Sequence, residues 1–116
     1  MAASDLTMYL IVRKDLKMSF GKALAQCGHA IEHLVRTTPK PLMQNYHRDG
    51  SAKIVLAVRG QDELLAISVD CAGISCKYLV VDAGKTELPE NTITVLGIGP
   101  ISKKDVPRSV ANLSLY

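Results

Sequence analysis

GKALAQCGHAIEH, residues 21–33, is the stretch around which we expect this chain to be organised. At about 100° per residue, an α-helix gathers four of its polar side chains within a sector of roughly 60°: Lys22, Gln26, His29 and His33. The opposite side is apolar and consists of Ala23, Leu24, Cys27, Ala30, Ile31, Leu34 and Val35. The pattern predicts an amphipathic helix that packs on a core through its apolar side.

The polar stripe of this helix has two interpretations. One is an ordinary solvated face, which every amphipathic helix needs. Such faces are typically built from pairs of Glu and Lys, whereas this one holds a glutamine, two histidines and a single lysine. We therefore favour a functional stripe that is free for chemistry.

The composition is that of a small globular protein. The chain has 116 residues, of which 47% are hydrophobic and 22% charged, and this predicts one domain over residues 1–116 with residues 1–5 as a flexible tail. No apolar run approaches the roughly 20 residues of a membrane span, and the first residues lack the pattern of a secretory signal. We therefore expect a cytoplasmic protein.

Cysteine and charge patterns restrict the kinds of site. The three cysteines are an odd number without C-x-x-C spacing, which favours reduced thiols over disulfides or a Cys-rich zinc site. A net charge of +3 permits an anionic partner without requiring one. Basic residues cluster just before and within the helix: Arg13, Lys14, Lys17 and Lys22. This cluster is either a solvated loop or a patch that contacts phosphates.

Strands and helices alternate along the predicted chain. The predicted strands cover residues 6–12, 53–58, 76–81 and 92–98. The predicted helices cover residues 21–35, 41–48 and 60–71, with a short last helix opening at 102–105. We expect Gly73 to cap the third helix, Gly99-Pro100 to close the fourth strand and residues 113–116 to form a weak tail.

This alternation predicts an α/β fold in which at least part of the sheet is parallel. Ligands of such sheets bind beyond the carboxyl ends of the strands. Two loops are therefore singled out, residues 13–21 after the first strand and residues 82–89 after the third.

A zinc motif is one alternative for the helix. His29-Ala30-Ile31-Glu32-His33 matches H-x-x-E-H, in which two histidines bind the metal and the glutamate is the base. However, a helix directs Glu32 roughly 80–100° away from the two histidines, and a catalytic site needs a third ligand. We therefore treat a metalloprotease as a minor alternative and assign no metal ligand.

Asp82-x-Gly84-x-Thr86 is the second candidate constellation. A carboxylate at the end of a strand can orient water or accept its proton, and a nearby hydroxyl can bind a substrate. The alternative is an Asx-type turn in which Asp82 only caps its own loop. The residue types alone do not separate these two interpretations.

Taken together, these segments resemble the type-2 peptidyl-tRNA hydrolase family of archaea and eukaryotes. Five matching motifs follow one another in the expected order between about residues 8 and 100: YLIVRKDLKM at 9–18, G-K-x-x-A-Q-C-x-H-A at 21–30, KIVL at 53–56, D-A-G-K-T-x-x-x-P at 82–89 and TITVLGIGP at 92–100. Five ordered motifs are far more specific than any one of them.

The resemblance implies hydrolysis of the ester that joins a peptide to the 3′-terminal ribose of tRNA, without a metal or organic cofactor. Position by position, it places the functional lysine, aspartate and threonine of the family on Lys22, Asp82 and Thr86, with Gln26 and His29 as supporting residues. It also implies a four-stranded mixed sheet flanked by helices on both faces. The expected assembly is a homodimer, with peptidyl-tRNA as the partner rather than DNA or a membrane.

The basic residues then acquire a role. We expect Lys14, Lys17 and Lys85 to contact phosphates near the acceptor end of tRNA, so that binding weakens with salt. One departure concerns this surface. Family members commonly read Met-Gly-Lys-Gly-Lys where this chain reads Met18-Ser19-Phe20-Gly21-Lys22, so Phe20 replaces a lysine. This replacement predicts weaker RNA affinity rather than lost chemistry.

The alternative from another class is a non-catalytic adaptor on the same fold, binding RNA or protein. Phe20 motivates it, and the retained Lys22, Asp82 and Thr86 weigh against it. An aromatic content of 4% without tryptophan also disfavours an RNA binder that works by base stacking.

Overall fold

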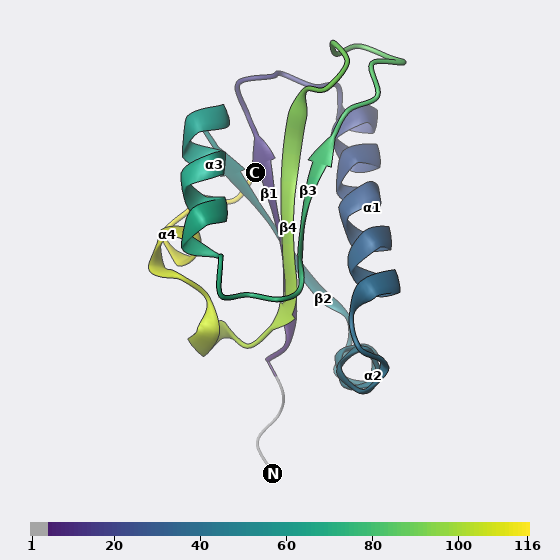
Figure 1. The fold of residues 1–116 in the computed structure, drawn as a ribbon, viewed down its shortest axis with the longest axis vertical. Coiled ribbons are helices and arrows are strands. Elements are labelled where there is room, and N and C mark those ends of the chain that lie inside the picture. The colour runs from purple at the N-terminus through teal and green to yellow at the C-terminus, as the bar shows by residue number, and fades with distance from the viewer. Residues whose placement is uncertain (1–4) are drawn as a thin grey trace.

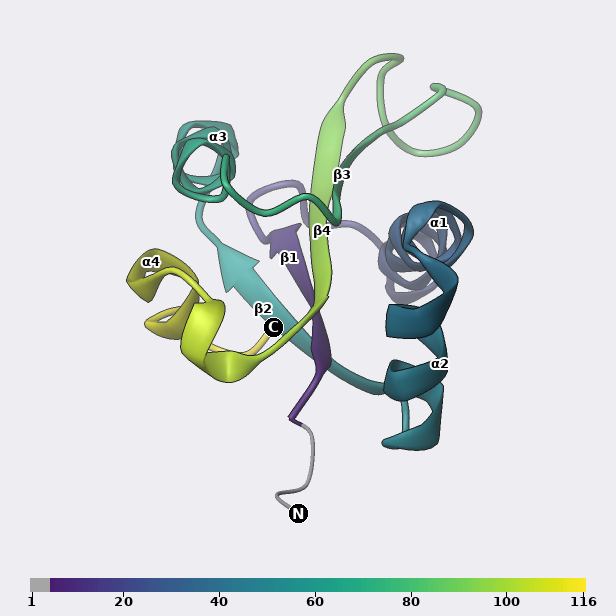
Figure 2. The same ribbon diagram turned by 60° about the horizontal axis from the view of Figure 1, so that its bottom comes forward.

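The computed structural model describes residues 5–116, and residues 1–4 of the predicted tail lie outside this part. Its elements follow the order β1 (Thr7–Arg13), α1 (Phe20–Thr37), α2 (Lys40–Arg48), β2 (Ala52–Val58), α3 (Gln61–Asp70), β3 (Lys77–Val81), β4 (Ile93–Ile101), a 3-10 turn (Lys103–Asp105) and α4 (Arg108–Ala111). Helices α1 and α2 cover one face of the sheet, and α3 and α4 cover the other (Figure 1). The turned view in Figure 2 shows the same layers. This confirms the predicted fold class.

The sheet is mixed, with the strand order β2-β1-β4-β3. Strands β1 and β2 are parallel, and β4 is antiparallel to both β1 and β3. Strands β1 and β3 therefore run in the same direction, and the segments that follow them leave the sheet at the same end. In Figure 1 the start of α1 and the loop between β3 and β4 lie side by side there.

Strand β1 is buried along its whole length, which explains its uninterrupted apolar sequence. Successive side chains of a strand point to opposite faces. Tyr9 and Ile11 accordingly contact the layer of α3 and α4, and Leu10 and Val12 contact the layer of α1. The continuous apolar run thus marks a central strand with a core on each side.

Helix α1 packs closely on β4 through its small and branched residues. Ala30 and Leu34 are fully buried. A Cβ atom on Gly97 of β4 would lie 3.0 Å from Cβ of Ala30 and 3.1 Å from Cδ1 of Leu34. Glycine at this position therefore lets the helix approach the sheet. This close packing places the first turn of α1 beside the loop that follows β3.

The predicted apolar side of α1 was too wide. Leu24 and Val35 are exposed, although both were predicted to pack on the core. The contact with the sheet covers a narrower arc than the apolar residues occupy, so one flank of the helix extends beyond the sheet. The helix also begins at Phe20 and ends at Thr37, slightly outside the predicted 21–35.

The ends of two predicted elements differ in the structure. Strand β4 continues through the cis Gly99–Pro100 bond to Ile101, since Gly99 N–H donates to the carbonyl of Cys76 at 2.8 Å. Helix α3 ends at Asp70, and its C-cap is Cys71 rather than the predicted Gly73.

The predicted weak tail is instead attached to the sheet. Leu115 forms an antiparallel bridge with Leu56 of β2. The N–H of Ala57 donates to the carbonyl of Ser114 at 2.9 Å, and the N–H of Tyr116 donates to the carbonyl of Val55 at 3.0 Å. The end of the chain therefore covers the outer edge of β2.

Candidate active site

The first turn of α1 is fastened to the loop that follows β3. Ser19 is the N-cap of the helix, and its hydroxyl accepts a hydrogen bond from the N–H of Lys22 at 3.2 Å. Its own N–H and hydroxyl donate to the Glu87 carboxylate at 2.8 and 2.6 Å. These two hydrogen bonds lower the pKa of Glu87. The loops singled out in the sequence are thus joined through side chains.

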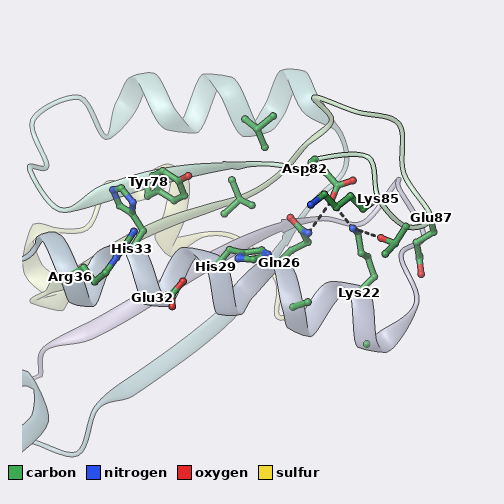
Figure 3. A pocket seen from close by; sticks show the side chains of 16 residues that line it. Lys22, Gln26, His29, Glu32, His33, Arg36, Tyr78, Asp82, Lys85 and Glu87 are labelled. Atoms are coloured by element: carbon green, nitrogen blue, oxygen red, sulfur yellow. Dashed lines mark hydrogen bonds and ion pairs between the residues drawn. The ribbon is translucent and has the colours of Figure 1, made fainter.

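Lys22, Asp82 and Thr86 form one hydrogen-bonded cluster at this junction. Lys22 and Asp82 are labelled in Figure 3. Nζ of Lys22 donates to Oδ1 of Asp82 at 2.5 Å and to Oγ1 of Thr86 at 2.5 Å. The Lys22 and Asp82 side chains are only 9% and 4% exposed. The three residues assigned through the resemblance are therefore brought together, although about 60 positions separate the lysine from the other two.

The carboxylate of Asp82 is held in its charged form. The hydrogen bond from Lys22 contributes most to lowering its pKa, and the Gly84 N–H, the Lys22 charge and the Gln26 amide act in the same direction, against the effect of burial. Hydrogen bonds and positive charges stabilise the ionised form. Asp82 therefore provides a fixed negative charge at neutral pH.

The two carboxylate oxygens of Asp82 have different partners. Oδ2 accepts the Gly84 N–H at 3.1 Å, as in an Asx turn, while Oδ1 faces Lys22. Gly84 has a φ of +78°, and a Cβ atom there would lie 2.7 Å from the main chain of Glu90. This turn therefore requires glycine at position 84. The turn also orients the Asp82 side chain towards α1.

Gln26 connects this cluster to the sheet. It is only 3% exposed, and its Nε2 donates to Oδ1 of Asp82 at 3.1 Å. Its Oε1 accepts the hydroxyl of Thr94, a fully buried residue of β4, at 2.8 Å. Thr94 was missed in the sequence, where the one signal was a polar residue within an apolar strand. Its hydroxyl fixes the orientation of the Gln26 amide.

The whole polar stripe of α1 lines one groove. Lys22, Gln26, His29 and His33 face a groove of about 640 Å³ whose opposite wall includes Tyr78. The His33 ring stacks on the Tyr78 ring with centroids 3.7 Å apart. His29 is exposed, and within residues 5–116 no hydrogen bond joins it to the Lys22 cluster. All four side chains of the stripe therefore line one groove, and His29 forms part of its wall.

The zinc hypothesis finds no support in the arrangement of side chains. Across residues 5–116, no three or more His, Cys, Asp and Glu side chains are grouped so that they could hold a metal ion. His33 is instead engaged with Tyr78.

The basic cluster separates into buried and exposed members. Arg13 is buried: Nη2 lies 2.7 Å from Oδ2 of Asp15, and Nη1 donates to the carbonyl of Ile93 at 3.0 Å. It is therefore not a phosphate contact. The other three candidates for RNA contact are exposed: Lys14, Lys17 and Lys85. Lys85 also lines the groove beside the Lys22 cluster.

The sequence matches known proteins along nearly its whole length. Residues 6–116 match the family model described as peptidyl-tRNA hydrolase PTH2. This chain belongs to the PTH2 family. Its match to the peptidyl-tRNA hydrolase of Methanothermobacter thermautotrophicus is 43% identical and covers 91% of this chain and 96% of the relative. The probable peptidyl-tRNA hydrolase 2 of Drosophila melanogaster is 39% identical, over 93% of this chain and 60% of the relative.

A human relative, named peptidyl-tRNA hydrolase 2, mitochondrial, is 33% identical, and the match covers 98% of this chain and 66% of the relative. The chain therefore spans nearly the whole length of the archaeal PTH2 relative and about 60% of the fly one. Among the helices of residues 5–116, none has the length and apolar character needed to cross a membrane.

Proposed function

We propose that this PTH2 member hydrolyses the ester between a peptide, or an N-blocked amino acid, and the 3′-terminal ribose of tRNA, and so recycles the tRNA. The observation that carries the proposal is the junction of Lys22, Asp82 and Thr86 at one end of an open groove. The names of the curated relatives support it, since they are peptidyl-tRNA hydrolases.

The geometry suits attack by water on an ester carbonyl. Water adds to the carbonyl carbon and negative charge develops on the carbonyl oxygen, which a fixed positive charge stabilises. Nζ of Lys22 supplies that charge. The carbon–oxygen bond to the ribose then breaks. Of the two protons that the water brings, one passes to the ribose oxygen and the other to solvent, so the peptide leaves as a carboxylate. We propose that these steps need no metal or organic cofactor.

Asp82 and Thr86 act on the attacking water in this proposal. The lowered pKa of Asp82 makes it a weak base, which favours orienting the water through a hydrogen bond over removing its proton outright. The Thr86 hydroxyl, already within reach of Lys22, positions the water or the edge of the ribose. Gln26 is a positioning residue, because it acts by holding Asp82 in place.

The exposed lysines bind the RNA part of the substrate. Lys14, Lys17 and Lys85 extend from the two loops that meet at the site. Contacts to phosphates position RNA without reading its bases, and each released counterion makes binding depend on salt. Affinity for tRNA is expected to fall between 50 and about 200 mM salt. An affinity that does not change with salt contradicts this assignment.

We further propose a cytoplasmic homodimer. Phe20 and Leu24 are 83% and 60% exposed, and they line an apolar groove with Val55 of β2 and Tyr116. Exposed apolar surfaces of this kind typically mark an interaction site. Light scattering is expected to give twice the monomer mass, and Leu24→Glu is expected to give the monomer mass. Cell fractionation against a mitochondrial marker tests the location.

The deciding experiment measures release of the amino acid from N-acetyl-aminoacyl-tRNA, with EDTA present throughout. Asp82→Ala and Lys22→Ala are each expected to lower kcat/KM at least about tenfold, or about 1.4 kcal/mol of transition-state stabilisation. Lys40→Ala, a matched loss of positive charge at the exposed start of α2, is expected to leave the rate unchanged. Activity that EDTA abolishes contradicts the cofactor-free mechanism.

Other outcomes separate the alternatives. An inactive protein that binds tRNA in a salt-dependent way favours the adaptor, and Phe20 is then the first residue to examine. Full activity in both alanine variants contradicts the catalytic roles of Lys22 and Asp82.

A further inference from the structure

The groove is much longer than the cluster that we propose for catalysis. Its lining residues extend along α1 from Gly21 to Arg36, which is about 22 Å at 1.5 Å per residue. The Lys22 cluster occupies only the end formed by the first turn of the helix. Figure 3 shows His33, Arg36 and Tyr78 together at the other end. Most of the groove therefore has no role in the mechanism above.

The wall opposite α1 is β3, which lies at the edge of the sheet. β4 is its neighbour on one side, and no strand of the described chain lies on the other. Main-chain groups of an antiparallel strand alternate between its two sides. The Gly99 N–H of β4 donates to the Cys76 carbonyl, so the main-chain groups of Cys76 face β4. The alternate residues Lys77, Leu79 and Val81 therefore direct their main-chain groups towards the open side.

We propose that this open edge and the groove bind the peptide part of the substrate as an extended strand beside β3. The inference rests on the proposed function, because it assumes that the ester lies at Lys22 and Asp82. Main-chain N–H and carbonyl groups are common to all peptides. Hydrogen bonds between the peptide main chain and a sheet edge use these groups.

The position of the ester also sets the direction of the peptide. Asp82 directly follows the last residue of β3, so the carboxyl end of the peptide lies at the carboxyl end of the strand. The peptide therefore runs parallel to β3. The five residues of β3 span about 16 Å at roughly 3.3 Å per residue, which is room for a peptide of similar length.

Charge favours the peptide over the RNA as the occupant of the distal groove. Exposed lysines are located at the loop end, where Lys85 lines the groove. The distal half carries Glu32 as well as Arg36, and its walls are joined by the stacked rings of His33 and Tyr78. A phosphate backbone requires a net positive path. A mixed, partly aromatic surface suits a peptide with varied side chains.

The kinetic test compares two substrates, N-acetyl-alanyl-tRNA and N-acetyl-tetraalanyl-tRNA. We expect kcat/KM to be at least about fivefold higher for the longer substrate, the effect of roughly one additional hydrogen bond. His33→Ala is expected to reduce this ratio at least about twofold. His47→Ala, on the exposed face of α2, is its matched control and leaves both rates unchanged. Equal rates for the two substrates, or an equal loss on both in His33→Ala, overturn the proposal.

A second test looks for the alternation of a paired strand. In the tetraalanyl substrate, an N-methyl group is placed on either the second or the third residue from the ester. Only one of these two N–H groups faces β3 in an extended peptide. One substrate is therefore expected to lose the advantage of length and the other to keep it. Loss in both, or in neither, contradicts strand pairing.

A binding measurement keeps this inference separate from the proposed function. N-acetyl-tetraalanine and the trinucleotide CCA are titrated into the labelled protein, and the amide signals of Lys77, Leu79 and Val81 are followed by NMR. The peptide is expected to shift these signals even if the protein hydrolyses neither substrate. Shifts caused by CCA alone mean that the groove holds the RNA end and overturn the proposal, as does the absence of any shift.

Discussion

The two flanks of α1 differ in which kind of side chain is buried. On one flank the polar Gln26 is only 3% exposed, while on the other the apolar Leu24 and Phe20 are 60% and 83% exposed. For Gln26 and Leu24, the helical wheel predicts the reverse. The wheel determines the direction of a side chain, but burial depends on which segment lies beside it. The Asp82 loop and β4 cover the first flank, whereas Leu24 and Phe20 border an open groove.

The flanks also differ in how their side chains are held. A buried polar group is costly unless it is hydrogen-bonded, and Gln26 meets this condition at both ends of its amide. That flank is therefore preorganised, which is what electrostatic catalysis needs. The apolar flank has no such internal constraint, so its side chains are available to a partner.

The largest effect is expected from removing the positive charge of the polar flank. Lys22→Met is expected to lower kcat/KM about hundredfold, the typical effect of losing a group that stabilises a developing oxyanion. A substitution that leaves the rate within about threefold of the wild type means that the flank is not the catalytic one. Circular dichroism checks that the fold is retained.

The same variant predicts a change in pH dependence. Lys22 lowers the pKa of Asp82 from its ordinary value of 3.8. The stability that their pairing contributes is present above pH 3.8 and is lost as the pH falls through the lower folded-state pKa. In Lys22→Met the pKa of Asp82 rises, so residual activity is lost at a higher pH than in the wild type. A rate profile down to about pH 3 tests this shift. An unchanged acid limb means that Asp82 does not control it.

The second test concerns the buried amide. Gln26→Leu leaves the hydroxyl of Thr94 buried without its partner, which is expected to lower the free energy of unfolding by about 2 kcal/mol. The double substitution Gln26→Leu with Thr94→Val removes both polar groups and is expected to recover most of the loss. Urea unfolding of the two variants measures this. A double variant as unstable as the single one shows that the hydrogen bond is not the cause.

A smaller effect is expected from restoring the family lysine on the apolar flank. Phe20→Lys places a positive charge beside the lysines of the loop and is expected to raise tRNA affinity about fivefold at low salt, with kcat nearly unchanged. One additional phosphate contact steepens the slope of log K against log salt by about 0.7 to 0.9. Fluorescence titrations at several salt concentrations provide both quantities. An unchanged slope contradicts RNA contact at this position.

The smallest effect is predicted for Leu24. Leu24→Ala removes an exposed side chain and is expected to change the free energy of unfolding of the monomer by less than about 0.5 kcal/mol. Leu34→Ala on the same helix removes a fully buried one and is expected to cost about 2–5 kcal/mol. Similar losses in the two variants, measured by urea unfolding of dilute protein, would show that the apolar flank is covered in the monomer as well.

Local sequence patterns predicted most of the fold. The apolar runs located all four strands, and the helical period located α1, α2 and α3 within a few residues. The resemblance named Lys22, Asp82 and Thr86, and their proximity follows from β1 and β3 ending on the same side of the sheet. Thr94 was not predicted, because a threonine in a strand shows its partner only when the strand is placed against α1.

The sequence by itself determined the elements, the α/β class and the polar stripe of α1, since periodicity and turn residues act over a few positions. Only the tertiary structure decided that Gln26 is buried while Leu24 is exposed. It also decided that Arg13 is buried, with Nη1 donating to the carbonyl of Ile93 on β4, and that residues 114–116 join the edge of β2. Each of these depends on contacts between segments far apart in the chain, and the free energy of such contacts exists only once those segments are adjacent.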